Sequence, residues 1–172
     1  MSLAHESGIN VPEIQLVTSK KGNKFFMIKR FDRRGEEKVH MITAAALLEV
    51  DFRAPSLDYN ELVKLTRVLT KNDDDVLDMY RRMVFNVLID NQDDHTKNFS
   101  FLFDNQTRTY RLSPAYDITP GKTYYGEHTT SVNGKSKNIA DEDMLLVASK
   151  NLIDKEVAES IINRCKKVLK TR

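Results

Sequence analysis

The chain has 172 residues, of which 40% are hydrophobic and 30% are charged, and its formal net charge is +2. This is an ordinary composition for a globular protein of one domain or one large lobe, and the small net charge does not by itself indicate nucleic-acid binding. A single cysteine, Cys165, excludes an intrachain disulfide, and together with the lack of a signal peptide or a long apolar span it predicts a cytoplasmic protein with no membrane contact.

The first residues predict the end of a helix. Gly8 follows it as a left-handed stop, and Pro12 lies just beyond. Because a single helical turn is not stable alone, we expect the chain to begin inside an element whose larger part is absent. Residues 14–18 and 25–31 then predict a β-hairpin through the turn at 21–23.

The middle of the chain predicts three helices. Residues 42–50 open at Thr43 and contain three alanines, which favours a short helix before a break at residues 55–56. Asp58 and Glu61 form a D-x-x-E start for a helix that runs to about residue 70. The third helix has acids at 73–75 in its first turn, where the macrodipole favours them. Its apolar positions at 76, 80, 83, 84 and 87–89 predict a buried spine.

The segment after this spine carries the most informative motif. Asp93 and Asn98 stand five residues apart, like the Asp and Asn of the kinase catalytic loop H-R-D-x-x-x-x-N. In that chemistry the Asp accepts the proton of the acceptor hydroxyl and the Asn helps to hold Mg²⁺. Residues 99–103 and 110–113 read as strands, and a hairpin there would return Asp117 beside Asn98, so that both could hold one Mg²⁺.

Other interpretations of these residues remain open. Asp and Asn also gather at simple turns, but the loop's position between a buried helix and an aromatic strand favours phosphoryl transfer. His95 could be a structural hydrogen-bonding residue that orients Asp93, or it could contact a phosphate. Asp93, Asp94, His95 and Asp117 could instead be a metallohydrolase ligand set, which would leave Lys97 and Asn98 without a role.

Two more helices, at 141–149 and 154–170, are predicted to end the chain, with residues 120–134 as a loop. The predicted architecture is therefore an α-rich α+β fold.

The motifs resemble the HipA family of bacterial Ser/Thr kinases, the toxin half of toxin–antitoxin modules. The resemblance extends over nearly the whole chain, with matching segments at 3–13, 28–33, 91–100, 110–118, 131–135 and 142–145. It implies that Asp93 is the catalytic base, with His95 and Lys97 in the same catalytic loop, and that Asn98 and Asp117 bind Mg²⁺. It also implies that the backbone of Lys29, Arg30 and Phe31 lies along the adenine of ATP. Asp94 departs from the small residue common in parts of the family, and its extra carboxylate could affect metal binding.

By this resemblance, residues 1–34 would be the remnant of an N-lobe and the hinge, and residues 35–172 a protein-kinase-like C-lobe. The implied activity is ATP- and Mg²⁺-dependent phosphorylation of a protein substrate, such as an aminoacyl-tRNA synthetase. The implied partner is an antitoxin protein, through which any contact with DNA would be indirect.

No phosphate-binding Gly-rich loop is visible in these residues, and Lys29 reads as a hinge residue rather than a phosphate ligand. We therefore expect the 172 residues alone to be a weak or inactive enzyme. A non-catalytic partner-binding module and a small-molecule phosphotransferase remain alternatives.

Overall fold

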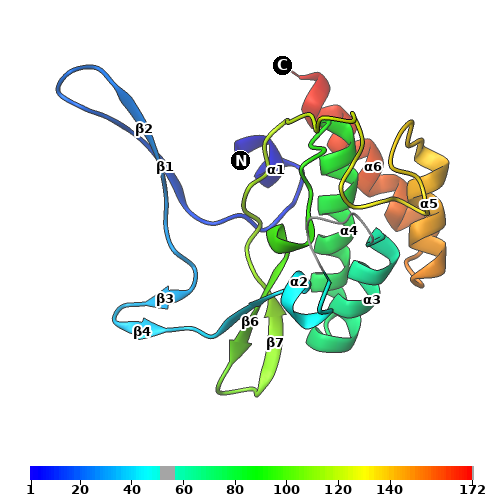
Figure 1. The fold of residues 1–172 in the computed structure, drawn as a ribbon, viewed down its shortest axis with the longest axis horizontal. Helices are drawn as coiled ribbons and strands as arrows, with labels where there is room; N and C mark the ends of the chain where they lie inside the picture. Colours follow the sequence, from blue (N-terminus) through cyan, green and yellow to red (C-terminus); the bar gives the residue numbers. More distant parts are fainter. Residues whose placement is uncertain (51–56, 172) are drawn as a thin grey trace.

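The computed structural model describes residues 1–50 and 57–171. The helices α3 (Tyr59–Thr70), α4 (Asp73–Leu88), α5 (Asp141–Lys150) and α6 (Lys155–Lys170) pack together as the body of the molecule (Figure 1). The short helix α1 (Ser2–Glu6) packs against α6. These bounds agree closely with the predicted helices, while the predicted break at residues 55–56 lies outside the described residues.

Local capping explains where the helices of the body begin. The Asp58 side chain accepts a hydrogen bond from the backbone N–H of Asn60. The Glu61 carboxylate accepts one from the backbone N–H of Asp58, which completes the predicted capping box. The side chain of Asn72 caps α4, and that of Asp154 caps α6. At the front, Gly8 has a φ of +88° and its backbone N–H bonds the carbonyl of His5, so α1 ends as predicted.

The helix α4 supplies much of the core. Its side chains Val76, Met79, Tyr80, Met83 and Val84 are at most 1% exposed, and burial of each such side chain stabilises the fold by roughly 1.5–3 kcal/mol. Residues 87–89 are only partly buried, although their apolar side chains predicted that they belong to the buried spine. The helix ends at Leu88, and the chain turns there toward the predicted catalytic loop.

In the described part of the chain, the strands form three antiparallel groups. The strand β1 (Ile14–Thr18) pairs with β2 (Lys24–Ile28), and β3 (Arg33–Arg34) pairs with β4 (Glu37–Lys38). In the third group, β6 (Ser100–Asp104) lies between β5 (Met41–Thr43) and β7 (Thr109–Leu112). The predicted hairpin before Asp117 is therefore confirmed.

The strand β5 was not predicted. Its residues Met41–Thr43 pair with Leu102 to Ser100, so the predicted helix at 42–50 shrinks to α2 (Ala44–Leu47). Thr43 caps this helix, since its Oγ1 accepts a hydrogen bond from the Ala46 N–H at 3.2 Å. Pairing with a strand nearly sixty residues away overrides the local helical preference of this segment.

The hairpin of β1 and β2 projects away from the helical body (Figure 1). The predicted strand at 25–31 ends at Ile28, and every residue of β2 is exposed. Large side chains such as Leu16 (60% exposed) and Phe26 (56%) face solvent. The predicted division of the chain at residue 34 stays a prediction.

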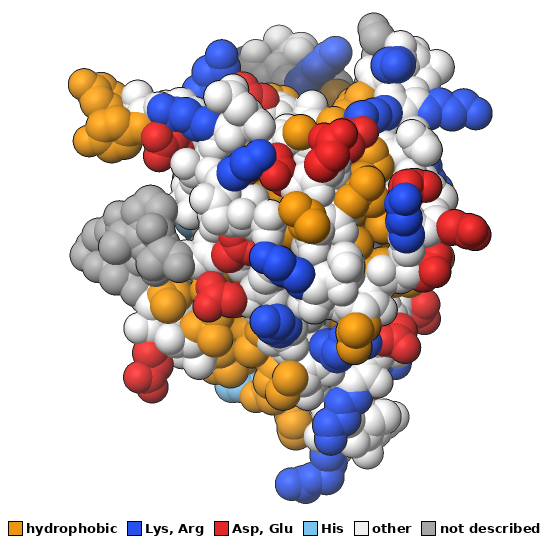
Figure 2. All heavy atoms as spheres, turned by 90° about the vertical axis from the view of Figure 1, so that its right-hand side faces the viewer, with side chains coloured by type: hydrophobic (Ala, Val, Ile, Leu, Met, Phe, Trp, Pro, Cys, Tyr) orange, Lys and Arg blue, Asp and Glu red, His pale blue; other side chains and the backbone are white. Residues whose placement is uncertain are grey.

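The face formed around α5 and α6 carries basic and acidic side chains side by side (Figure 2). Two basic residues of α6 are bonded within the protein: Lys166 pairs with Asp141, and Arg164 donates to the carbonyl of Glu6. No helix in the described part of the chain is long and apolar enough to cross a membrane. The fold is α-rich α+β, as predicted.

Candidate active site

The loop between α4 and β6 contains the predicted catalytic residues. It leaves α4 through Asp90, which adopts a left-handed conformation, and ends in a single 3-10 turn, Thr96–Asn98. The side-chain amide of Asn98 donates a hydrogen bond of 3.0 Å to the carbonyl of Asp93. This bond closes the loop on itself and ties the predicted base to the predicted metal ligand.

The segment after β7 brings Asp117 to the same place. Ser113 continues the β6–β7 pairing, because its N–H donates to the carbonyl of Ser100. Asp117 then adopts a left-handed conformation, with a φ of +55°. The side-chain amide nitrogen of Asn91 donates a long hydrogen bond of 3.5 Å to the carbonyl of Asp117. This bond helps to hold the uncommon backbone conformation of Asp117.

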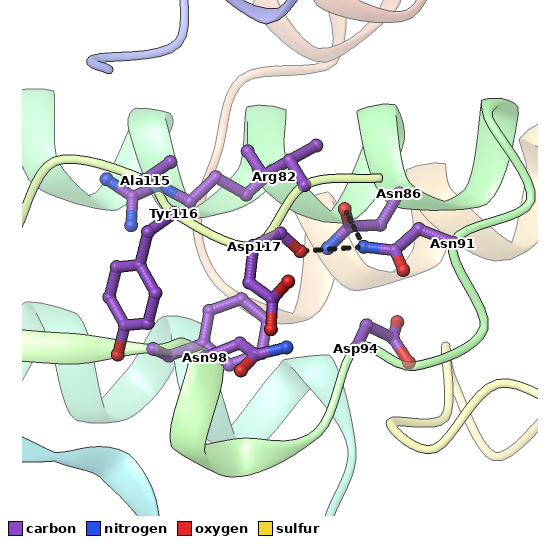
Figure 3. A pocket seen from close by; sticks show the side chains of 10 residues that line it. Arg82, Asn86, Asn91, Asp94, Asn98, Ala115, Tyr116 and Asp117 are labelled. Atoms are coloured by element: carbon purple, nitrogen blue, oxygen red, sulfur yellow. Dashed lines mark hydrogen bonds between the residues drawn. The ribbon is translucent and has the colours of Figure 1, made fainter. Parts of the chain in front are cut away.

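Asp117 and Asn98 face one another across a small polar pocket (Figure 3). The pocket lies between α4, the loop and the segment after β7. It is lined by Arg82, Asn86, Asn91, Asp94, Asn98, Phe99, Ala115, Tyr116, Asp117 and Ile118. Carboxylate and amide oxygens suit Mg²⁺, which usually takes one or two protein ligands and fills its remaining positions with phosphate and water. The donor set therefore fits Mg²⁺, and the metal role of the two residues stays a prediction.

The side chain of Asp93 lies on the solvent-exposed side of the loop between α4 and β6. This side chain is 68% exposed, and its Oδ1 is 4.0 Å from Nε2 of the more buried His95. The carbonyl of Lys97 accepts a hydrogen bond from the Tyr116 hydroxyl at 2.6 Å. Asp93 is thus accessible to an acceptor hydroxyl. Lys97 is also exposed, and His95 is partly buried.

Asp94 has the opposite environment. Its carboxylate is fully buried and accepts hydrogen bonds from the Tyr59 hydroxyl (2.9 Å), the Thr130 N–H (3.1 Å) and His128 Nδ1 (3.1 Å). Burial raises the pKa of Tyr59 well above its usual value, and the charge of Asp94 adds to this rise. Asp94 is therefore committed to structural hydrogen bonds.

The metallohydrolase ligand set is not assembled. Among the described residues, no group of three or more His, Cys, Asp or Glu side chains is arranged to hold a metal ion.

The predicted adenine-contacting residues lie after β2. The ammonium of Lys29 pairs with Glu13 at 3.0 Å, and Arg30 pairs with Asp32 at 2.6 Å, so neither side chain enters the pocket. The ring of Phe31 lies 5.7 Å, between centroids, from that of Tyr116, which itself lines the pocket. Of the three, Phe31 is the one in contact with the site, and the backbone contact with adenine stays a prediction.

Sequence reasoning missed the polar residues of α4 that support the site. Asp78, Arg82 and Asn86 are buried at intervals of four on a helix that is otherwise apolar on this side. Arg82 donates to Asp78 (2.6 Å) and to the carbonyl of Ser113 (2.5 Å), and Asn86 accepts from Asn91 (3.1 Å). The i, i+4, i+8 spacing of polar residues was the signal in the sequence that could have revealed them.

Comparison with known proteins gives one matching family model and several relatives named as putative kinases. The family model for the HipA-like C-terminal domain matches residues 1–172. The chain is 33% identical over 179 residues to the Sinorhizobium fredii protein named "Putative kinase Y4dM", a match that covers 93% of this chain and 43% of that protein. A second protein of that organism, named "Putative kinase Y4mE", is 28% identical over 135 residues, covering 72% and 31%. The chain thus spans less than half the length of these curated relatives.

Two solved structures show a similar fold. HipA of Shewanella oneidensis, in a complex with HipB and operator DNA, matches with a TM-score of 0.80 and 19% identity over 98% of this chain and 45% of that one. The Helicobacter pylori proinflammatory kinase CtkA matches with a TM-score of 0.58 and 18% identity, over 99% and 77%. The expected kinase-like α+β fold is confirmed.

Proposed function

The chain belongs to the HipA-like C-terminal domain family, as its motifs predicted, and on this premise we propose that it is the catalytic lobe of an ATP- and Mg²⁺-dependent Ser/Thr protein kinase. The observation that carries the proposal is the pocket in which Asp117 and Asn98 face one another, with Asp93 five residues before Asn98 (Figure 3). Curated relatives named as kinases support the general class.

The proposed chemistry follows from the position of each side chain. Asp93, exposed at the rim, would accept the proton of the acceptor hydroxyl as that oxygen attacks the γ-phosphorus of ATP. The bond from the γ-phosphorus to the bridging oxygen would break, and ADP would leave with that oxygen. Asn98 and Asp117 would hold Mg²⁺, which supplies charge stabilisation and orientation of the phosphates when bound. Because phosphoryl transfer depends mainly on positioning, the bonds that fix Asn98 and Asp117 matter as much as the ligands themselves.

We extend the proposal to the protein's partners. The Shewanella relative of known structure is the HipA of a toxin–antitoxin system, bound to HipB and operator DNA. By analogy, we propose that this chain is part of a cytoplasmic toxin, restrained by an antitoxin protein that contacts DNA. The proposed acceptor is a protein such as an aminoacyl-tRNA synthetase.

The metal site can be tested by nucleotide binding to the full-length protein that carries this chain. Asp117→Asn is expected to weaken Mg·ATP binding about tenfold or more, while affinity for ATP in EDTA stays the same, because only the metal-dependent part of binding is lost. Isothermal titration calorimetry measures both values. Asp74→Asn makes the same charge change at an exposed position of α4 and is the matched control. Unchanged metal-dependent affinity in Asp117→Asn would remove Asp117 from the metal site.

A further inference from the structure

The catalytic loop is bonded to a segment that follows the metal ligand, residues 121–131. Gln92, directly before Asp93, makes several of these bonds. Its N–H donates to the carbonyl of Gly121 at 2.8 Å, and its carbonyl accepts from the N–H of Thr129 at 2.9 Å. Its side-chain oxygen accepts from the N–H of Thr123 at 2.9 Å. The segment is therefore fixed to the backbone on one side of Asp93.

Asp94 fixes the same segment on the other side of Asp93. Its carboxylate accepts from His128 Nδ1 and from the Thr130 N–H, while its carbonyl accepts from the Thr130 hydroxyl at 2.5 Å. Tyr59 of α3 donates to the same carboxylate, and Asn86 of α4 donates to the Tyr59 hydroxyl at 3.0 Å. A buried carboxylate is costly unless it is bonded in this way, so these contacts strongly restrict the local backbone.

We infer that Asp94 and His128 are positioning residues that set the direction of the Asp93 carboxylate. The inference rests on the proposed kinase function. The Asp94 side chain is fully buried while that of the adjacent Asp93 is 68% exposed, so anchoring Asp94 in the interior holds the backbone that directs Asp93 toward solvent. Small misplacements of a reacting group have large effects on rate, which makes this anchor a determinant of turnover.

His128 offers a clean test of the anchor. Because the Asp94 carboxylate only accepts hydrogen bonds, His128 must carry a proton on Nδ1. In His128→Asn, the side-chain amide nitrogen takes the place of Nδ1 and keeps the donor. His128→Leu has nearly the same shape as the Asn variant and removes the donor. The two variants differ mainly in this one hydrogen bond.

The experiment measures phosphate transfer from labelled ATP to dephosphorylated casein by the full-length protein. We expect His128→Leu to lower kcat by about 10- to 100-fold, with KM for ATP changed by less than about threefold, because the anchor acts on the base rather than on the nucleotide. His128→Asn should recover kcat to within about threefold of wild type. Hydrogen exchange at the Thr130 N–H reports on the anchor independently of activity, and should become faster in the Leu variant alone.

Several outcomes would overturn the inference. A wild-type kcat in a folded His128→Leu protein would do so, as would equal loss of kcat in the Leu and Asn variants, since the donor would then be irrelevant. If His128→Leu fails to fold, Thr130→Val tests the same anchor, because it removes the hydroxyl that bonds the Asp94 carbonyl and keeps the side-chain shape. Unchanged transfer by Asp93→Asn would instead show that the proposed function of the site is wrong.

Discussion

Asp93 and Asp94 are adjacent and chemically identical, but their side chains are 68% and 0% exposed. The difference comes from the partners that the fold supplies. Tyr59 of α3 and the segment with His128 and Thr130, which lie far apart in the sequence, converge on Asp94. The side chain of Asp93 instead faces solvent, with its Oδ1 4.0 Å from Nε2 of His95. At the residue scale, the fold therefore leaves the carboxylate of Asp93 accessible for the proposed reaction and commits that of Asp94 to structural hydrogen bonds.

This assignment predicts different defects in two isosteric variants of the full-length protein. Asp93→Asn should abolish phosphotransfer and leave nucleotide binding and stability intact, because its side chain is solvated. Asp94→Asn should lower the free energy of unfolding by about 1–3 kcal/mol, since an amide N–H must then face another donor. Labelled ATP and urea denaturation measure the two effects. Loss of turnover in Asp94→Asn with normal turnover in Asp93→Asn would mean that the catalytic register is wrong by one residue.

At the scale of elements, α4 is both the core of the body and the support of the site. Its apolar side chains pack against the other helices, while Arg82 and Asn86 line the pocket together with Asp117. Arg82 is 2% exposed and bonds both Asp78 and the carbonyl of Ser113. The N–H of Asn10 also donates to Asp78, so one ion pair joins α4 to two distant segments.

Removing one partner of this pair should be strongly destabilising. Arg82→Met is expected to lower the free energy of unfolding by about 3–5 kcal/mol, because it leaves the Asp78 carboxylate buried with a single donor. The double variant Asp78→Asn/Arg82→Met should be more stable than Arg82→Met, since no unpaired charge remains. Guanidinium denaturation measures both values. A loss below about 1 kcal/mol in Arg82→Met would contradict a supporting role for this ion pair.

The cap of α3 predicts a pH-dependent contribution to stability. Burial acts to raise the pKa of Asp58, but hydrogen bonds from Ser131, Asn60 and Gly134 outweigh it and hold the pKa below its usual value. The unfolded state thus binds a proton more readily than the folded state. The contribution of Asp58 to the free energy of unfolding is fully present above the pKa that Asp58 has in the unfolded chain, about 3.9. This contribution is lost as the pH falls through the lower pKa of the folded state.

Asp58→Asn provides the comparison, because Asn also caps helices but does not titrate. Wild type should be more stable than this variant by about 1 kcal/mol at neutral pH. That advantage should shrink as the pH falls below about 4. Denaturation curves at pH 7, 5 and 3 test this, and an advantage that is constant from pH 7 to pH 3 would rule out titration of Asp58 as its source.

At the scale of the whole molecule, the helical body and the β1–β2 hairpin differ in burial. The body has a continuous core formed by α3 to α6 and the β5–β7 sheet, whereas the hairpin exposes Leu16, Phe25 and Phe26. Its Lys29 pairs with Glu13 rather than reaching the pocket. Among the described residues, the side chains proposed to position phosphate through Mg²⁺ are therefore Asn98 and Asp117, which line the pocket.

The 172-residue chain by itself should fold but transfer phosphate poorly. Circular dichroism should show cooperative thermal unfolding of the body. Affinity for Mg·ATP should be at least about tenfold weaker than in the full-length protein, because these residues contain no Gly-rich loop to position the γ-phosphate. Robust transfer that disappears in Asp93→Asn would show that this chain does contain a phosphate-binding element, and residues 20–29 would be the first segment to test.

The sequence alone determined the helices of the body and the residues that make up the proposed catalytic motif. Caps such as Asp58 with Glu61 act within four residues, and the spacing of Asp93 and Asn98 is a property of the chain itself. Tertiary structure decided the pairing of β5 with β6, the burial of Asp94, and the support of Asp117 by Arg82 and Asn91. Each of these depends on neighbours that are dozens of residues away, and burial and hydrogen bonding to such neighbours exist only once the chain has folded.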